Sequence, residues 1–128
     1  MKNNLALALM HESDSLKFAE RVVTACEDVK GQDIAVLDVR TVSDFADYFV
    51  VVTGRSDRQV QGLTNRIIED LIASGLRPLS VEGYEEGQWV LVDCGDIVVH
   101  IFYEPVRDFY DIESLWMRAP KVRVRGAA

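Results

Sequence analysis

The stretch Trp89–Tyr103 is WVLVDCGDIVVHIFY, in which two runs of strand-forming residues flank the dipeptide Gly95-Asp96. Two such runs joined by a two-residue turn are typical of a β-hairpin. The turn places Cys94 opposite Ile97, and the pairing then continues along both arms. We therefore predict two neighbouring antiparallel strands at the centre of the fold.

The two faces of this hairpin differ, because side chains alternate between the faces of a strand. One face is almost wholly apolar and is predicted to be core: Val90, Val92, Cys94, Ile97, Val99 and Ile101. The other face mixes large apolar groups with a carboxylate and an imidazole: Trp89, Leu91, Asp93, Val98, His100 and Phe102.

The mixed face has two interpretations. A second layer of the fold could cover it as ordinary core. Tryptophan, however, is enriched among residues that dominate binding energy, and Asp93 and His100 would lack partners in a dry core. These two facts favour an interaction surface that includes Trp89.

Three further runs predict the remaining strands. Ile34–Val39 is short, apolar and rich in branched residues, and Tyr48–Thr53 (YFVVVT) is typical of a strand buried on both faces. Pro78 precedes a short strand near Leu79–Glu82, and Gly83–Gln88 is predicted to be a loop.

Two helices alternate with these strands. Ser13–Lys30 has apolar residues along one side and Gly31 just after its end. The second helix begins at Ser56, which with Gln59 forms a capping box, and ends at Gly75. Its inward positions repeat at three- and four-residue steps: Val60, Leu63, Thr64, Ile67, Ile68, Leu71 and Ile72.

The sequence therefore predicts an α/β fold with a central β-sheet of about five strands flanked by helices. Its 128 residues, 48% hydrophobic and 27% charged, suit one domain. We place this domain at residues 1–117 and expect residues 118–128 to be a basic, flexible tail.

The charge distribution indicates the kind of partner. The net charge is −7, and because the tail contains Arg118, Lys121, Arg123 and Arg125, residues 1–117 carry −11. So acidic a body repels phosphate backbones and attracts basic surfaces. We expect a basic protein partner and no direct nucleic-acid binding by the body.

Cysteine use and hydropathy indicate a cytoplasmic protein. The apolar run Leu5–Met10 is too short for a secretion signal, and no stretch is long enough to span a membrane. Cys26 and Cys94 lie far apart and show no pairing pattern, so both are expected to be buried thiols in a reducing compartment.

The residues that could carry chemistry are few. His11 and His100 are the only histidines, and no ligand spacing is present, so we predict neither a metal site nor a cofactor. The junction VVVTGRSD, residues 50–57, could hold a phosphate at a helix start. It lacks the downstream pair of carboxylates that nucleotidyl transfer needs for Mg²⁺, which favours a capped helix start and a protein without catalytic activity.

Four stretches together resemble one family: GQDIAVLDV (31–39), ADYFVVVTGRSDRQV (46–60), Glu82-Gly83 and WVLVDCGDIVVHIFYEPVRDFYDIESLW (89–116). This pattern is similar to that of the ribosomal silencing factors, also called the Iojap-like family, and covers Gly31 to Met117. The resemblance implies a mixed-sheet fold with nucleotidyltransferase-like topology but without the catalytic centre.

The resemblance also implies a function. Such proteins bind the large ribosomal subunit at its fourteenth ribosomal protein, which is basic, and sterically stop the small subunit from joining when nutrients are scarce. The implied partner-binding surface includes Trp89, Leu91 and Asp93, with Glu82, Asp96 and His100 nearby.

Other parts of the chain are left open by this resemblance. The last two helical turns are expected at Arg107–Trp116, which match the family, but packing and partner contact stay open for Phe109, Tyr110 and Trp116. The basic tail has no counterpart in the family. A nucleotide-binding or nucleotidyl-transferring enzyme on the same scaffold is the main alternative function, and a homodimeric adaptor that uses the Trp89 face is a third.

Overall fold

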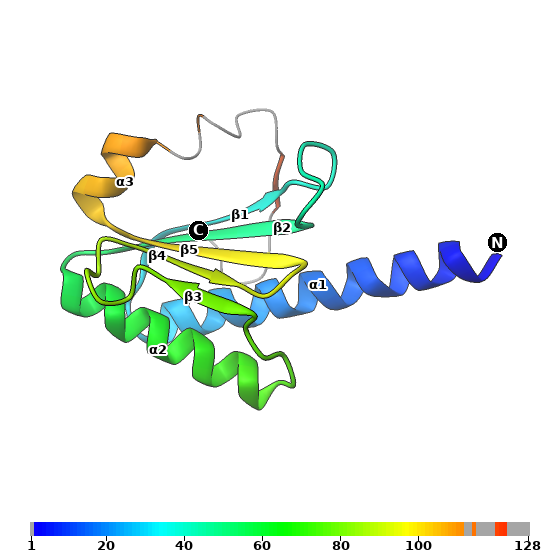
Figure 1. Ribbon diagram of the computed structural model, residues 1–128, viewed down its shortest axis with the longest axis horizontal. Coiled ribbons are helices and arrows are strands. Elements are labelled where there is room, and N and C mark those ends of the chain that lie inside the picture. Colours follow the sequence, from blue (N-terminus) through cyan, green and yellow to red (C-terminus); the bar gives the residue numbers. More distant parts are fainter. Residues whose placement is uncertain (1, 112–113, 115–119, 123–128) are drawn as a thin grey trace.

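The computed structural model describes the backbone of residues 2–111, 114 and 120–122, and their side chains except those of residues 2–13 and 109–110 (Figure 1). The elements in chain order are α1 (Lys2–Asp28), β1 (Gln32–Asp38), β2 (Tyr48–Gly54), α2 (Asp57–Ala73), β3 (Ser80–Glu82), β4 (Trp89–Asp93), β5 (Ile97–Tyr103), α3 (Glu104–Tyr110) and β6 (Lys121–Val122).

The strands form one mixed sheet in the order β3-β4-β5-β2-β1-β6. β2 and β5 pair in parallel, and all other neighbours pair antiparallel. The long crossover that a parallel pair requires consists here of α2, β3 and β4. The predicted α/β fold with a mixed central sheet is confirmed.

The predicted hairpin is confirmed in register. Val92 pairs with Val99 and Val90 with Ile101, and the Cys94 N–H donates to the Ile97 carbonyl at 2.9 Å. Gly95 has φ +87°, the left-handed conformation that a glycine adopts at little cost. The six side chains predicted to form the apolar face are all buried.

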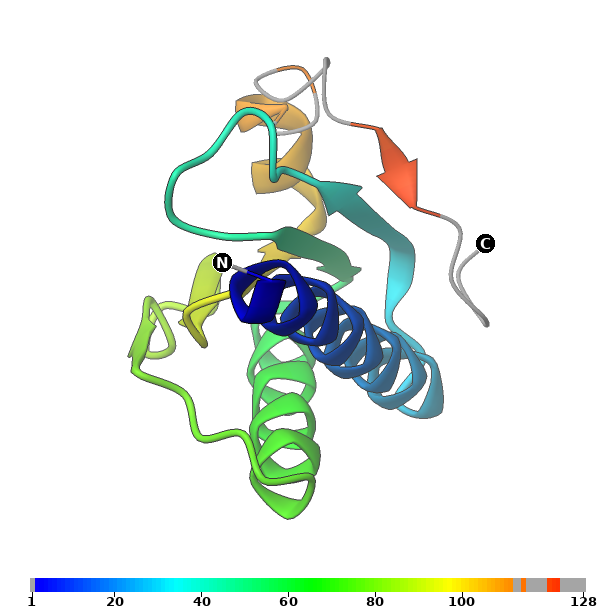
Figure 2. The same ribbon diagram turned by 90° about the vertical axis from the view of Figure 1, so that its right-hand side faces the viewer.

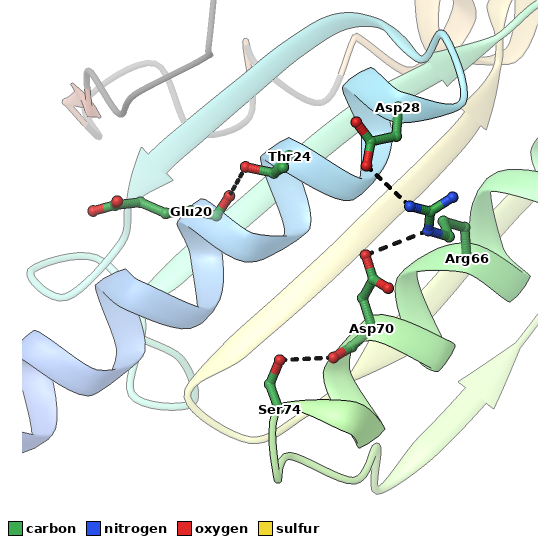
Figure 3. A network of polar contacts seen from close by, with 6 residues as sticks. All are labelled: Glu20, Thr24, Asp28, Arg66, Asp70 and Ser74. Carbon is green, nitrogen blue, oxygen red and sulfur yellow. Dashed lines mark hydrogen bonds and ion pairs between the residues drawn. The ribbon is translucent and has the colours of Figure 1, made fainter.

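Two helices cover that apolar face, and α3 lies on the opposite side of the sheet (Figures 1 and 2). The main core joins side chains of α1 and α2 to the inward residues of the central strands. A polar contact supports the helix pair: Arg66 of α2 lies 2.9 Å from Asp28 of α1 and 3.4 Å from Asp70 of its own helix (Figure 3).

The start of α2 shows how the sequence specifies the helices that cover the apolar face. Ser56 accepts a hydrogen bond from the Gln59 N–H at 3.0 Å, and the Gln59 side chain accepts one from the Arg55 N–H at 2.6 Å. The predicted cap is therefore present. Of the seven predicted inward residues, Ile72 departs from expectation because it lies in the last turn of the helix and is 41% exposed.

Some predicted boundaries were wrong. Helix α1 begins at Lys2 and not at Ser13, since the run Leu5–Met10 consists of strong helix formers and continues the helix beyond the end of the sheet (Figure 1). The third helix begins at Glu104, with Pro105 in its first turn, three residues before its predicted start.

The tail region also departs in part from expectation. Lys121 and Val122 form β6 against β1, and the Asp38 N–H donates to the Pro120 carbonyl at 2.9 Å. This sixth strand was missed because two residues in a basic segment give no apolar run. Most of residues 118–128, and Trp116, lie outside the described residues, as do the side chains of Phe109 and Tyr110.

A second, smaller core lies on the face away from α1 and α2. It contains Phe49, Val51 and Phe102, with Val106 of α3 packed against it. His100 joins this core: its ring meets Phe49 edge-on at 4.8 Å, and only 4% of the residue is exposed. Burial lowers the pKa of His100 from 6.5 to about 4.

His100 should make the fold sensitive to acid. Between pH 6.5 and about 4 the unfolded chain binds a proton at His100 and the folded chain does not, so stability is lost as the pH falls through this window. The loss approaches about 3 kcal/mol at the lower end. Urea unfolding at pH 7, 6, 5 and 4 measures it. His100→Gln, which cannot titrate, should show a flatter dependence; equal slopes would contradict the prediction.

Candidate partner-binding site

The predicted site residues lie mainly on one face of the sheet. Trp89, Leu91 and Asp93 alternate along β4 on the face away from α1 and α2. Cross-strand pairing puts Leu91 between Glu82 of β3 and His100 of β5. Paired residues point to the same face, so β3, β4 and β5 bring these five side chains together.

Exposure separates these residues into a surface group and a buried one. Glu82 is exposed, whereas Trp89, Leu91, Asp93 and Asp96 are half-buried. His100 lies beneath the surface, and Phe102 is fully buried. The mixed face is thus part core and part surface, and both interpretations of the sequence describe a portion of it.

The indole of Trp89 is oriented from below. Its ring lies 4.9 Å from that of Phe102, tilted by 30°. The Nε1–H donates to Nδ1 of His100 at 3.2 Å. A tryptophan needs a partner for this N–H when partly buried, and His100 supplies it. The indole is therefore held in one orientation before any partner arrives.

This hydrogen bond fixes the proton on the imidazole. Because Nδ1 accepts, the neutral ring carries its hydrogen on Nε2. Among the described residues Nε2 is buried without a hydrogen-bond partner. An unpaired buried donor lowers the stability of the fold. The hydrogen bond that orients Trp89 therefore comes with a loss of folding stability at His100.

The acidic side chains stand on backbone that is fixed by hydrogen bonds. Oδ1 of Asp93 accepts from the Gly95 N–H at 2.8 Å, which closes the turn. The Asp96 carbonyl accepts from the N–H groups of Asp47 and Tyr48, at 2.7 and 3.1 Å, and thereby attaches the turn to the start of β2. The Asp93 carboxylate thus has a defined position at the turn. Asp96 has a fixed backbone but lines a pocket with Ser15 and Phe18 of α1, toward the helix side of the sheet.

This part of the chain is strongly negative. From Ser80 to Asp96 it carries five carboxylates, which are Glu82, Glu85, Glu86, Asp93 and Asp96, and no lysine or arginine. Carboxylates spread along the segment that carries a half-buried indole form a surface that complements a cationic partner.

Several residues that shape this region were not predicted from the sequence. Phe49 packs against the ring of His100. The run Tyr48–Thr53 was predicted as a strand buried on both faces, but its contact with His100 was not predicted. The parallel pairing that brings Phe49 beside Val98 has no local sequence signal. Leu79 and Val81, at the edge of the sheet, are exposed. Edge strands usually carry charged side chains, so these two apolar residues in a short predicted strand were the available signal in the sequence.

The candidate phosphate-binding junction has a structural explanation. A Cβ on Gly54 would lie only 2.9 Å from Cγ2 of Val60, so glycine permits close packing of α2 on β2. The Ser56 hydroxyl is engaged at the cap. These contacts favour the interpretation of this junction as a capped helix start.

Neither cysteine has the environment of a reactive thiol. Burial raises the pKa of Cys26 to about 12 and that of Cys94 to about 11, so both stay protonated at neutral pH. This confirms that they are buried small side chains. Within residues 2–111, 114 and 120–122, no group of three or more histidine, cysteine or acidic residues could hold a metal ion. No helix in those ranges is long and apolar enough to cross a membrane.

Comparison with known proteins identifies the family. The family model described as "Ribosomal silencing factor during starvation" matches residues 12–128. Ribosomal silencing factor RsfS of Bacillus subtilis is 40% identical over 111 residues, which cover 87% of this chain and 92% of that protein. RsfS of Chromobacterium violaceum is 43% identical over 100 residues, 78% of this chain and 82% of that protein.

A solved structure agrees with this match. A crystal structure of a Chromobacterium violaceum protein superposes with a TM-score of 0.79 at 41% identity, covering 89% of this chain and 95% of that one. Matches in sequence and in three dimensions thus extend over most of the chain, and the chain belongs to the family of ribosomal silencing factors.

Proposed function

We propose that the protein represses translation by binding the large ribosomal subunit at its fourteenth ribosomal protein and keeping the small subunit from joining. It acts in the cytoplasm by obstruction, without catalysis and without a cofactor. Membership of the silencing-factor family supports a role at the ribosome, and the remaining details rest on the site.

One observation carries the choice of binding surface: a half-buried indole, fixed by His100 and Phe102, shares an open sheet face with the carboxylates of Glu82 and Asp93. Aromatic side chains with a defined orientation bind with little loss of conformational entropy. Carboxylates nearby attract a basic ribosomal protein and exclude acidic competitors. Trp89 and Leu91 are proposed as apolar contacts, with Glu82, Asp93 and Asp96 as acidic ones.

His100 has a different proposed role from the other five residues. Its ring is buried and accepts the hydrogen bond from Trp89. We therefore assign it to orientation of the indole and not to direct contact with the partner.

Ribosome association is tested by sedimentation. In a sucrose gradient of lysate, the protein should travel with free large subunits and be absent from joined ribosomes, because obstruction and joining exclude one another. Adding it to purified subunits should lower the yield of joined ribosomes. Sedimentation only at the top of the gradient would contradict the proposal. Protection against heat by ATP or GTP would instead favour the nucleotide-binding alternative.

Trp89→Ala tests the apolar contact. Loss of the indole should cost on the order of 2 kcal/mol or more of binding, as for an aromatic hot spot. Because Trp89 is half-buried, folding stability should fall by only about 1–2 kcal/mol. Calorimetry with the fourteenth protein and thermal unfolding measure the two. Trp89→Phe keeps the packing on Phe102, so its binding free energy and its folding stability should lie between those of the parent and of Trp89→Ala. A stable Trp89→Ala variant that binds like the parent would remove Trp89 from the site.

Asp93→Asn tests the electrostatic contribution. The amide oxygen can still accept from the Gly95 N–H, so the turn is preserved while one charge is lost. Association with large subunits should slow at low salt, and the difference from the parent should shrink as salt shortens the Debye length below about 8 Å. Glu27→Gln, the same charge change at an exposed position of α1, should have little effect. Equal rates for both variants would argue against this surface.

A further inference from the structure

The strand β3 is the edge of the sheet beside the proposed binding surface. It pairs on one side with β4, and no strand in the described part of the chain pairs with its other side. An unpaired edge offers its backbone N–H and C=O groups to a strand from another chain. The edge is therefore open next to Leu91 and Asp93.

The hydrogen bonding of the hairpin shows which edge groups face outward. The Cys94 N–H donates to the Ile97 carbonyl, and the Tyr103 N–H donates to the Gln88 carbonyl. Even-numbered residues of β4 therefore bond to β5, and Leu91 and Asp93 direct their backbone groups to β3. In an antiparallel ladder this alternation directs the N–H and C=O of Val81 to the open edge.

Two side chains at this edge, those of Leu79 and Val81, are apolar, whereas Ser80 and Glu82 of β3 are polar. Leu79 is 74% exposed and Val81 40% exposed, and with Ile72 they make up three of the five exposed large hydrophobic residues among the side chains that the structure describes. Leu79 lies beside the turn, since a Cβ on Gly95 would be 3.8 Å from its Cδ1. Natural edge strands are usually protected by charges or proline. Here Pro78 and Glu82 stand at the two ends, and Leu79 and Val81 leave the segment between them suited to pairing.

We infer that an extended segment of the basic partner protein pairs with the outer edge of β3 and continues the sheet. The segment would carry apolar side chains over Leu79 and Val81, and lysine or arginine beside the carboxylates that run from Glu82 to Asp96. This inference rests on the proposed function and adds the mode of binding. A second copy fits less well, because both copies carry the same excess of carboxylates between Ser80 and Asp96 and would repel one another.

The decisive variants are Val81→Pro and Val81→Thr. Proline removes the outward N–H, and because proline is tolerated where an edge N–H faces solvent, the bonds between β3 and β4 can remain. Threonine keeps the N–H and the branched shape. With purified large subunits, Val81→Pro should bind about tenfold more weakly than Val81→Thr, and both should unfold within a few degrees of the parent.

Hydrogen exchange gives a readout that needs no variant. In the parent, the Val81 amide should exchange rapidly alone and become protected when the isolated fourteenth ribosomal protein is added. Protection that rises with the concentration of the parent alone would show self-pairing and overturn the inference. An amide that stays unprotected in a formed complex would overturn it as well.

The outcomes separate this inference from the proposed function. If the parent and both variants bind subunits equally, edge pairing is wrong and subunit binding stands. If the parent does not bind subunits, both fail. If Val81→Pro does not fold, Leu79→Arg decides: it changes an exposed side chain and places a cation opposite the basic segment. It should weaken binding about tenfold, and unchanged binding would overturn the inference.

Discussion

The parallel pairing of β2 with β5 is the interaction on which the rest of the structure depends. Every residue of β2 is buried, and its pairs with β5 supply both cores at once. Val50 and Val99 face the helices, while Phe49 and Val98 face the other side. This pairing attaches the β4–β5 hairpin to the centre of the sheet. It also leaves β4 and β3 at the outer end, where their second face is not fully covered.

Local patterns predicted much of this architecture. Alternation gave the register of the hairpin, the β-branched run gave the buried strand β2, and Ser56 with Gln59 gave the start of α2. These features depend on residues that are neighbours in sequence. The placement of Leu91 and His100 on one face also followed from alternation, whereas Glu82 was named only through the family resemblance.

The features that sequence did not reveal depend on distant contacts. β6 exists because Lys121 and Val122 meet β1, far away in the chain. His100 was expected to need an external partner, but its ring is enclosed by Phe49 and Phe102 and bonded to Trp89. Its burial follows from the parallel β2–β5 pair, for which the sequence has no local signal. The same pairing decides which residues of the mixed face reach the surface.

The proposed mechanism of obstruction requires the protein to bind in one orientation, because a loosely rotating protein would leave room for the second subunit. Contact through a single indole and a few carboxylates defines where the protein binds on its partner better than it defines the orientation in which the protein binds. Pairing along β3 would supply the direction, since hydrogen bonds between strands define both register and orientation. The strand is only three residues long, which limits pairing with unrelated edges. The nearby carboxylates disfavour acidic strands, including its own copy, so a short apolar edge within negative charge can be specific where a long one would aggregate.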